Sequence, residues 1–393
     1  MKPGIWFLYL RTEELWGVSG FLSSKGMPMA LLPAIKVAWS LKQGHGDKPL
    51  VCKLKKALYG LKQAPRAWFS KLRDFLLSSQ FSLSKFDDSL FIKNTEGVIL
   101  YVLVYVDDII ITGTHQASID QFATNLNSRF SLKDLGPLSY FLGIEVSPTS
   151  NGLILSQHKY VLDFLRRAKM DQANGSPTPM VTSSTLSQHT GCAIDNASEY
   201  RSIVSVLQYV VITRLDITFA VNKGTLDYDI RFSAAPSLDM VGYSDANWGA
   251  DIDDRRSISG FCVTPRTRDR RWSRIRVVSR STAEAEYRAL AHVVTEVVLL
   301  ESLLSELHVS PSRKSSVWCD NSGAVAVSAN LEMRSKFKHV ELDLYFVREK
   351  VFAGKLSVGH VPTQEQVADM FTKPLSAPLF TKFRTCLKVV PKG

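Results

Sequence analysis

The chain has 393 residues, 45% of them hydrophobic and 10% aromatic, which suits two or three domains with real cores and excludes a wholly disordered protein. Its 48 lysines and arginines against 37 acidic residues give a net charge of +11, the sign expected of a protein that contacts phosphate backbones. Seven arginines and one aspartate between residues 266 and 280 contribute +6 of that charge, so the basic excess is largely local.

The five cysteines are dispersed without paired spacing, which favours free thiols in a reducing compartment and argues against a zinc site or a disulfide framework. No stretch approaches the ~20 apolar residues of a membrane span, and the apolar run at residues 5–10 is too short for the core of a signal peptide. We therefore expect an intracellular protein, cytoplasmic or nuclear, without a membrane partner.

The first part of the chain divides at its composition changes. Residues 1–46 match no periodic pattern. Residues 47–172 mix helical and strand patterns, and Pro65 can open a helix that carries Trp68 and Leu72 on one face. An α/β fold is therefore predicted for this part.

The rest of the chain continues with a second amphipathic helix predicted over residues 117–130. Residues 173–235 are predicted to be a linker and a shortened connection, because they begin with prolines, serines and threonines and contain a short helical stretch, residues 200–222. Residues 236–393 are predicted to form a final domain.

Two adjacent carboxylates, Asp107 and Asp108, are predicted at the tip of an apolar hairpin. Residues 98–104 form an apolar, largely β-branched run before them, and residues 109–112 form a second run after them. A two-residue turn favours Asn-Gly or Asp-Gly because both central residues need positive φ, so Asp-Asp indicates a position chosen for charge. The alternative is an ordinary surface hairpin with two solvated acids.

Four strings of this part are distinctive: KLKKALYGLKQAPRAWF at residues 53–69, DDSLF at 87–91, YVDD at 105–108 and LSYFLGIEV at 138–146. Together they resemble the reverse transcriptase of copia-type long-terminal-repeat retrotransposons. The likeness covers about residues 50 to 393. It implies a partial palm and thumb of an RNA-directed DNA polymerase, followed by a ribonuclease H-like mixed-sheet domain, in an α/β (α+β) chain.

The resemblance implies that Asp107 and Asp108 hold Mg²⁺, with Mn²⁺ as a substitute, for extension of a DNA primer on an RNA template with deoxynucleotides. The family also has a third aspartate on an earlier palm strand. Residues 1–46 contain no aspartate, and Asp47 lies in a turn-like Gly-His-Gly-Asp-Lys-Pro context. We therefore expect a truncated or degenerate copy that does not polymerise DNA by itself.

The resemblance also places the box before the hairpin beside the incoming nucleotide and the template. Its implied substrate-binding residues are Lys56, Tyr59, Gly60, Lys62, Gln63 and Arg66. Basic and aromatic side chains together suit phosphate contact and base stacking. In the alternative interpretation, Gly60 is a turn, Pro65 is a helix start and Lys62 is merely solvated.

The last domain carries an ordered series of acids. Asp245 lies in a predicted strand, residues 241–249, whose antiparallel neighbour is residues 257–263. Asp320 follows another predicted strand, and Asp369 lies on a predicted late helix.

The fourth acid, Glu286, lies on a helix that a capping box at residues 281–284 is predicted to open. It shares one stripe with apolar residues such as Leu290 and Val293, so its carboxylate is predicted on the buried face, where it needs a partner. Glu284 is the rival for this position, but it is predicted to turn away from the stripe.

The order Asp245, Glu286, Asp320 and Asp369 resembles the ribonuclease H site. The resemblance implies hydrolysis of the RNA strand of an RNA/DNA hybrid by two Mg²⁺ ions held by these catalytic acids. His339 could contact substrate phosphate or could start the following helix, and His360 is expected to be structural.

The Arg-dense segment 264–276 departs from the family pattern and is expected to disturb packing near Glu286. Three functions therefore stay open. They are a bifunctional enzyme completed by another chain, a ribonuclease H with an inactive polymerase, and a non-catalytic nucleic-acid-binding remnant.

Overall fold

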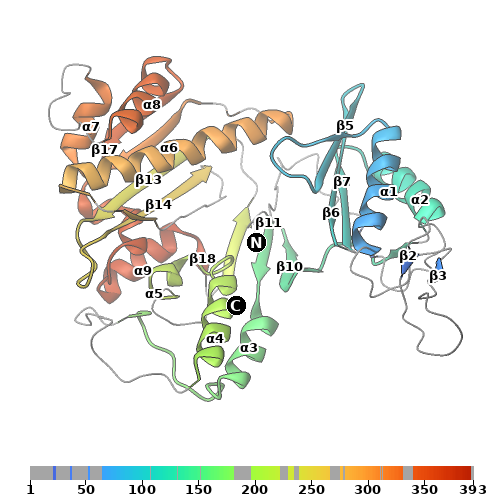
Figure 1. Cartoon of the computed structure of the whole chain (residues 1–393), viewed down its shortest axis with the longest axis horizontal. Helices are drawn as coiled ribbons and strands as arrows, with labels where there is room; N and C mark the ends of the chain where they lie inside the picture. Colours follow the sequence, from blue (N-terminus) through green and yellow to red (C-terminus); the bar gives the residue numbers. More distant parts are fainter. Residues whose placement is uncertain are drawn as a thin grey trace, which may run out of the picture. The chain divides into compact units, whose positions relative to one another are not determined.

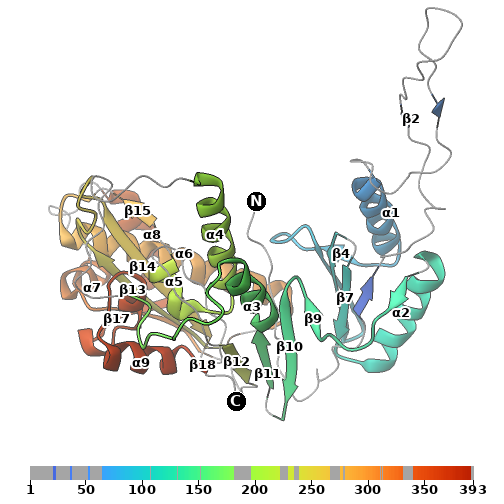
Figure 2. The same ribbon diagram turned by 90° about the horizontal axis from the view of Figure 1, so that it is seen from below.

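The computed structural model of the chain divides into two compact units, Met1–Leu138 and Ser139–Gly393, each with its own sheets and helices (Figures 1 and 2). Residues 139–172 therefore pack within the second unit. The structure describes residues 21–23, 36–37, 52–53, 64–106, 108–130, 132–150, 152–180, 196–221, 229–233, 239–265, 275–277, 279–309, 311, 313–330 and 340–390.

The first unit contains a six-stranded antiparallel sheet in the order β4-β5-β6-β7-β1-β8. Its strands are β1 (Phe21–Ser23), β4 (Ser82–Leu83), β5 (Leu90–Thr95), β6 (Val98–Tyr105), β7 (Asp108–Gly113) and β8 (Lys133–Asp134). A separate two-stranded ribbon joins β2 (Lys36–Val37) and β3 (Cys52–Lys53).

Two helices, α1 (Ala64–Ser78) and α2 (Gln116–Phe130), pack on this sheet (Figure 1). Leu72 and Leu76 of α1, together with Leu126 of α2, are fully buried in a cluster that also contains β6 and β7 side chains. Both helices were predicted from their apolar spacing, and both are confirmed. Pro65 lies in the first turn of α1, where a missing N–H costs no helical hydrogen bond.

The hairpin of β6 and β7 is confirmed, but its turn lies one residue earlier than predicted. Tyr105 pairs with Asp108, so Asp108 opens β7 rather than forming the turn. The first residue between them, Val106, has φ +53°, a conformation that a β-branched residue adopts only under strain. Asp107 lies outside the described residues.

The second unit begins with a five-stranded antiparallel sheet in the order β18-β12-β11-β10-β9. Its strands are β9 (Tyr140–Phe141), β10 (Ile144–Thr149), β11 (Gly152–Ser156), β12 (Asp229–Ser233) and β18 (Val389–Val390). Helix α3 (His158–Arg167) follows β11 directly.

The helical stretch predicted over residues 200–222 is broken into three pieces: α4 (Ala197–Val210), the 3₁₀ helix η1 (Leu215–Ile217) and α5 (Thr218–Val221). The Arg214 guanidinium donates to both carboxylate oxygens of Asp216, at 2.9 and 3.0 Å, in a buried pair. This bidentate pair at the break fixes the local conformation that ends the longer helix.

A second five-stranded sheet, in the order β15-β14-β13-β16-β17, forms the core of the remaining chain. Strand β14 (Ser257–Pro265) is antiparallel to both of its neighbours, β13 (Met240–Asn247) and β15 (Ile275–Val277). On the other side of β13, β16 (Ser315–Cys319) is parallel to β13, and β17 (Leu356–His360) is parallel to β16. Both strands predicted around Asp245 are confirmed. Residues 266–274 of the Arg-dense segment lie outside the described residues.

Helices cover both faces of this mixed sheet (Figure 1). The 25-residue helix α6 (Thr282–Glu306) packs on one face, where Ala246 of β13 contacts its alanines. The other face carries the 3₁₀ helix η3 (Val367–Phe371) and α9 (Ala377–Cys386), whose apolar side chains cluster with Cys262 and Tyr243. A methyl group at Gly260 would lie 2.7 Å from Phe371, so glycine permits η3 to approach β14 closely.

Three further helices complete the unit: α7 (Ser322–Ala329), α8 (Glu341–Phe352) and the 3₁₀ helix η2 (Thr363–Glu365). Within the described part of the chain, no helix has the length and apolarity that a membrane crossing requires. Cys262, Cys319 and Cys386 are thiols rather than halves of disulfides, as predicted, while the side chains of Cys52 and Cys192 fall outside that part.

Candidate active site

The register of the parallel strands brings two acids to the same end of the mixed sheet. Ser244 of β13 lies opposite Cys319 of β16, and Cys319 lies opposite His360 of β17. Asp245 and Asp320 each follow one of these paired residues, so their carboxylates project at the carboxyl ends of neighbouring strands, where α/β sheets commonly bind ligands.

Glu286 reaches the same end of the sheet from the first turns of α6. The helix begins as the capping box predicts, because the Ser281 hydroxyl accepts the Glu284 backbone N–H at 3.2 Å. The Glu284 carboxylate in turn accepts the backbone N–H of Arg280 at 2.9 Å, rather than that of the capping residue Ser281. Glu286 itself is only 4% exposed, as its place on the apolar stripe predicts.

Glu284, the rival acid, is also buried, which the sequence did not predict. Its carboxylate is satisfied by Arg288 at 2.7 Å, one helical turn further on. Among the described residues, Glu284 belongs to neither group of acids that could hold a metal ion. Its role is therefore to anchor the start of α6.

Asp369 is carried by η3, so the late helix predicted there is a short 3₁₀ helix. Gln366, which is fully buried, donates to the Ser244 carbonyl at 2.8 Å and accepts the Ala368 N–H at 3.3 Å. The hydroxyl of Thr372, just beyond η3, donates to Asp245 Oδ2. These bonds fix η3 against β13 and set Asp369 beside Asp245.

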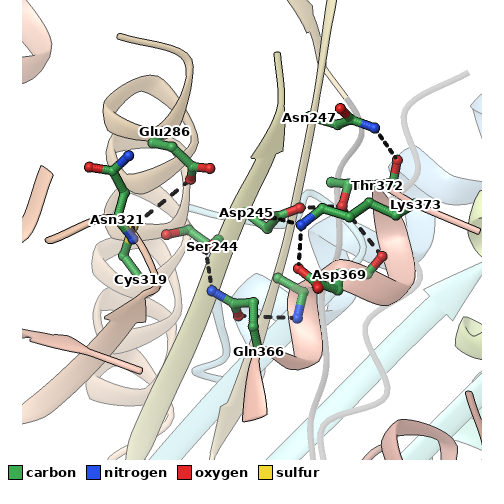
Figure 3. Close-up of polar contacts among 11 residues, drawn as sticks. Ser244, Asp245, Asn247, Glu286, Cys319, Asn321, Gln366, Asp369, Thr372 and Lys373 are labelled. Carbon is green, nitrogen blue, oxygen red and sulfur yellow. Dashed lines mark hydrogen bonds and ion pairs between the residues drawn. The ribbon is translucent and has the colours of Figure 1, made fainter. Parts of the chain in front are cut away.

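The four acids form two overlapping groups that share Asp320, and Figure 3 shows the other three, Asp245, Glu286 and Asp369. One oxygen from each of Asp245, Asp320 and Asp369 lies within 4.8 Å of the others, and Glu286 and Asp320 form a second such group with the Cys319 thiol. The structure therefore brings together all four acids predicted for the ribonuclease H site. Their catalytic role stays a prediction.

A cation lies among them. The Lys373 ammonium is 2.9 Å from Asp369 Oδ1 and 3.2 Å from Asp245 Oδ1. Figure 3 shows this side chain reaching between the two carboxylates from the segment that follows η3. The thiol of Cys319 lies on the other side, 3.9 Å from Glu286 Oε2.

Burial and mutual repulsion shift the protonation of these groups. Burial, followed by the charges of Asp245 and Asp320, raises the pKa of Glu286 to about 9. Burial and the charge of Asp245 raise the pKa of Asp369 to about 7, and burial raises the pKa of Asp245. Burial alone would lower the pKa of Lys373, but Asp245 and Asp369 outweigh that effect and raise it.

These observations fit a site for a divalent metal ion. Four carboxylates supply hard oxygen ligands, and the buried Oδ1 of Asp320 has no hydrogen-bond partner within the described part of the chain. Such an atom is costly unless a ligand satisfies it. A dication would also favour the ionised forms of Glu286 and Asp369, which burial disfavours.

Several residues at the site were not predicted. Lys373, Thr372, Gln366 and Cys319 all contact one of the four acids or the strand that carries Asp245. Lys373 lies four residues after Asp369, which is a spacing typical of ion pairs, and this was the available signal. Thr372 and Gln366 could not be predicted because their contacts cross from residue 372 to 245 and from 366 to 244.

Most of the residues that the resemblance implies for the polymerase site, and His339 of the last domain, lie outside the described residues. This holds for Asp107, His339 and the five box residues Lys56, Tyr59, Gly60, Lys62 and Gln63. Arg66 is exposed in the first turn of α1, and Asp108 opens β7. His360 is exposed at the end of β17, where its Nε2 lies 3.1 Å from the backbone oxygen of Asp320.

The strand order of the mixed sheet and the helices on its two faces are those of a ribonuclease H-like fold. Among known proteins, the family model "Reverse transcriptase (RNA-dependent DNA polymerase)" matches residues 40–182, which cover most of the first unit and the beginning of the second. A solved structure, LC11-RNase H1 with an RNA/DNA hybrid, matches 34% of this chain and 94% of its own, with 15% identity and a TM-score of 0.28.

Two curated relatives match most of the chain. The retrovirus-related Pol polyprotein from transposon RE1 of Arabidopsis thaliana is 41% identical over 370 residues, 87% of this chain and 25% of its own length. That from transposon TNT 1-94 of Nicotiana tabacum is 32% identical over 381 residues, 88% of this chain and 28% of its own. The chain belongs to the retrotransposon Pol polyproteins, of which it spans about a quarter of the length, and it includes a stretch that matches the reverse transcriptase model.

Proposed function

We propose that this chain hydrolyses the RNA strand of an RNA/DNA hybrid at the four-acid site. The convergence of Asp245, Glu286, Asp320 and Asp369 supports this proposal most strongly. Four buried or half-buried carboxylates in one place are unfavourable for folding, so a structural role does not explain them. Phosphodiester hydrolysis by bound divalent cations requires such a group.

In this proposal the four acids would hold Mg²⁺, with Mn²⁺ as a substitute. When bound, the metal would supply a polarised water nucleophile and stabilise charge on the leaving oxygen. Asp245 is aligned by the hydroxyl of Thr372, and Asp369 is aligned through Gln366. Glu286 is held by the rigid start of α6, where it accepts the Ala246 backbone N–H. The protein thus orients each ligand from a separate element.

We infer further that the chain does not polymerise DNA by itself. Strand β1 lies beside β7 in the palm-like sheet, with Ser23 opposite Asp108. Its residues Phe21, Leu22 and Ser23 contain no acid, so this neighbouring strand supplies no carboxylate to the Asp107–Asp108 pair. Two-metal polymerase chemistry needs ligands from separate strands.

Cleavage of a labelled RNA/DNA hybrid tests the proposal. Purified full chain should cut the RNA strand of the hybrid when Mg²⁺ is added, but should leave single-stranded RNA and the DNA strand intact. Asp245→Asn should abolish the cut, whereas Asp254→Asn, at an exposed acid paired with Arg256, should not. Equal cleavage by both variants would assign the activity to another site or to a contaminant.

The polymerase inference has its own assay. A DNA primer on an RNA template, with deoxynucleotides and Mg²⁺, should not be extended by the same preparation. Extension that disappears in Asp108→Asn would contradict the inference and would mean that a carboxylate reaches Asp108 from elsewhere.

A further inference from the structure

Lys373 places a positive charge on the carboxylate oxygens that a metal ion would need. Its ammonium lies 2.9 Å from Asp369 Oδ1 and 3.2 Å from Asp245 Oδ1, and its side chain is 32% exposed (Figure 3). Asp245 and Asp369 also belong to one of the two groups that could hold a metal. The lysine and a metal ion therefore compete for the same atoms.

The charges explain why a cation is needed when no metal is bound. Asp245 is 1% exposed and Asp369 is 5% exposed, so water screens their mutual repulsion poorly. An ammonium between them offsets this repulsion. The bond from Thr372 engages Asp245 Oδ2 and leaves Oδ1 to face Lys373.

The same charges explain why the lysine would yield to a dication. One ammonium balances only part of the charge on four acids, whereas a divalent ion balances more. Such an ion could also contact Oδ1 of Asp320, which has no hydrogen-bond partner among the described residues. Lysine has a long flexible stem, and the partial exposure of Lys373 gives its head a route to solvent without unfolding η3.

We propose that Lys373 is a positioning residue that acts as an internal counter-cation. It holds Asp245 and Asp369 together in the metal-free protein and leaves their oxygens when a divalent ion binds. The inference rests on the proposed function, because it takes the four acids as the metal ligands. It adds that Lys373 raises the concentration of divalent metal ion that is needed to fill the site.

Lys373→Met tests this with two measurements that do not use activity. The first is the unfolding temperature of the metal-free protein, and the second is the dissociation constant for Mn²⁺ by titration calorimetry. Lys350→Met is the matched control, since Lys350 pairs with a single exposed acid, Glu349, at 3.0 Å on α8. It removes the same charge away from the site.

We expect Lys373→Met to lower the metal-free unfolding temperature by about 3 °C or more relative to the control. We expect it to tighten Mn²⁺ binding about tenfold. The variant removes the positive charge of Lys373 beside the metal ligands, and at low screening the lost repulsion and competition correspond to about 1.4 kcal/mol of binding free energy. Lys373→Arg should keep the wild-type metal-free stability to within about 1 °C.

A double variant separates charge from packing and covers the case in which Lys373→Met folds poorly. Adding Asp369→Asn to Lys373→Met removes one of the two repelling carboxylates, so metal-free stability should recover if Lys373 acts by its charge. An unchanged unfolding temperature in Lys373→Met, no recovery in the double variant, or Mn²⁺ binding equal to that of wild type would each overturn the proposal.

The outcomes also distinguish this inference from the proposed function. Suppose that wild type binds Mn²⁺ and cleaves the hybrid, and that Lys373→Met has the same unfolding temperature and the same Mn²⁺ affinity as wild type. The inference then fails and the proposed function stands. If wild type binds no Mn²⁺ and cleaves no hybrid, the proposed function fails together with the competition between lysine and metal. The unfolding temperatures then still decide whether Lys373 neutralises the acids.

Discussion

Ser244 of β13 lies opposite Cys319 of β16. This parallel register places the acids that follow them, Asp245 and Asp320, toward the carboxyl ends of these two neighbouring strands. The remaining acids come from elements on opposite faces of the sheet, Glu286 from α6 and Asp369 from η3. The site therefore depends on two helices being fixed accurately against one pair of strands.

Gln366 is predicted to be essential for fixing η3. Its Nε2 donates to the Ser244 carbonyl at 2.8 Å in a fully buried place, so Gln366→Ala removes a buried hydrogen bond between the start of η3 and β13. We expect a loss of about 1–3 kcal/mol in unfolding free energy, together with weaker metal binding. Gln364→Ala, at an exposed side chain of η2, should change stability by less than about 0.5 kcal/mol. Equal effects of the two variants in denaturant titrations would contradict this account of η3.

The metal-free protein is predicted to lose stability as pH rises. The pKa of Glu286 is raised to about 9 and that of Asp369 to about 7, both above their ordinary values, so the folded state binds more protons than the unfolded state. Stability is then fully present below the ordinary pKa of each acid and falls as pH rises through the folded pKa. Each group contributes at most about 1.4 kcal/mol per pH unit.

Unfolding temperatures measured from pH 5 to 9 with a chelator present check this prediction. Glu286→Gln should flatten the decline, whereas Glu349→Gln, at an exposed acid, should not. Divalent metal should also flatten it, since a bound cation favours the ionised acids. Stability that rises steadily over this range in the chelated protein would contradict the raised pKa values.

The hairpin turn of the first unit is predicted to be strained at Val106. Its φ of +53° is costly for a β-branched residue, and glycine adopts that conformation freely. We expect Val106→Gly to stabilise the hairpin by roughly 0.5–1 kcal/mol, after the entropy that glycine adds to the unfolded chain. Val98→Gly, within β6, should destabilise it. Amide hydrogen exchange of β6 and β7 would measure both, and slower exchange in Val98→Gly than in Val106→Gly would refute the idea.

Sequence patterns predicted much of this fold because its elements are locally encoded. The spacing of Trp68 and Leu72 predicted α1, and the capping box at Ser281 predicted where α6 begins. Asp245, Glu286 and Asp320 could be placed from strand ends and a helical stripe. The family resemblance then assigned them a common site.

Other features depend on contacts that no local pattern contains. Glu284 was predicted to face away from the core, but Arg280 and Arg288 satisfy its buried carboxylate. The turn of the hairpin shifted by one residue because register, rather than residue type, decides which residues form it. Lys373 enters the site because η3 is a short 3₁₀ helix held by Gln366.

The most direct test of the proposed ribonuclease compares the cleavage of one RNA/DNA hybrid by wild type and four single variants. Asp245→Asn, Glu286→Gln, Asp320→Asn and Asp369→Asn keep the size of each side chain and remove its charge. The account predicts Mg²⁺-dependent cleavage of the RNA strand by folded wild type and a loss of at least about a hundredfold in each variant. Folded wild type that binds the hybrid without cutting it, or variants that cut as well as wild type, would contradict the central claim.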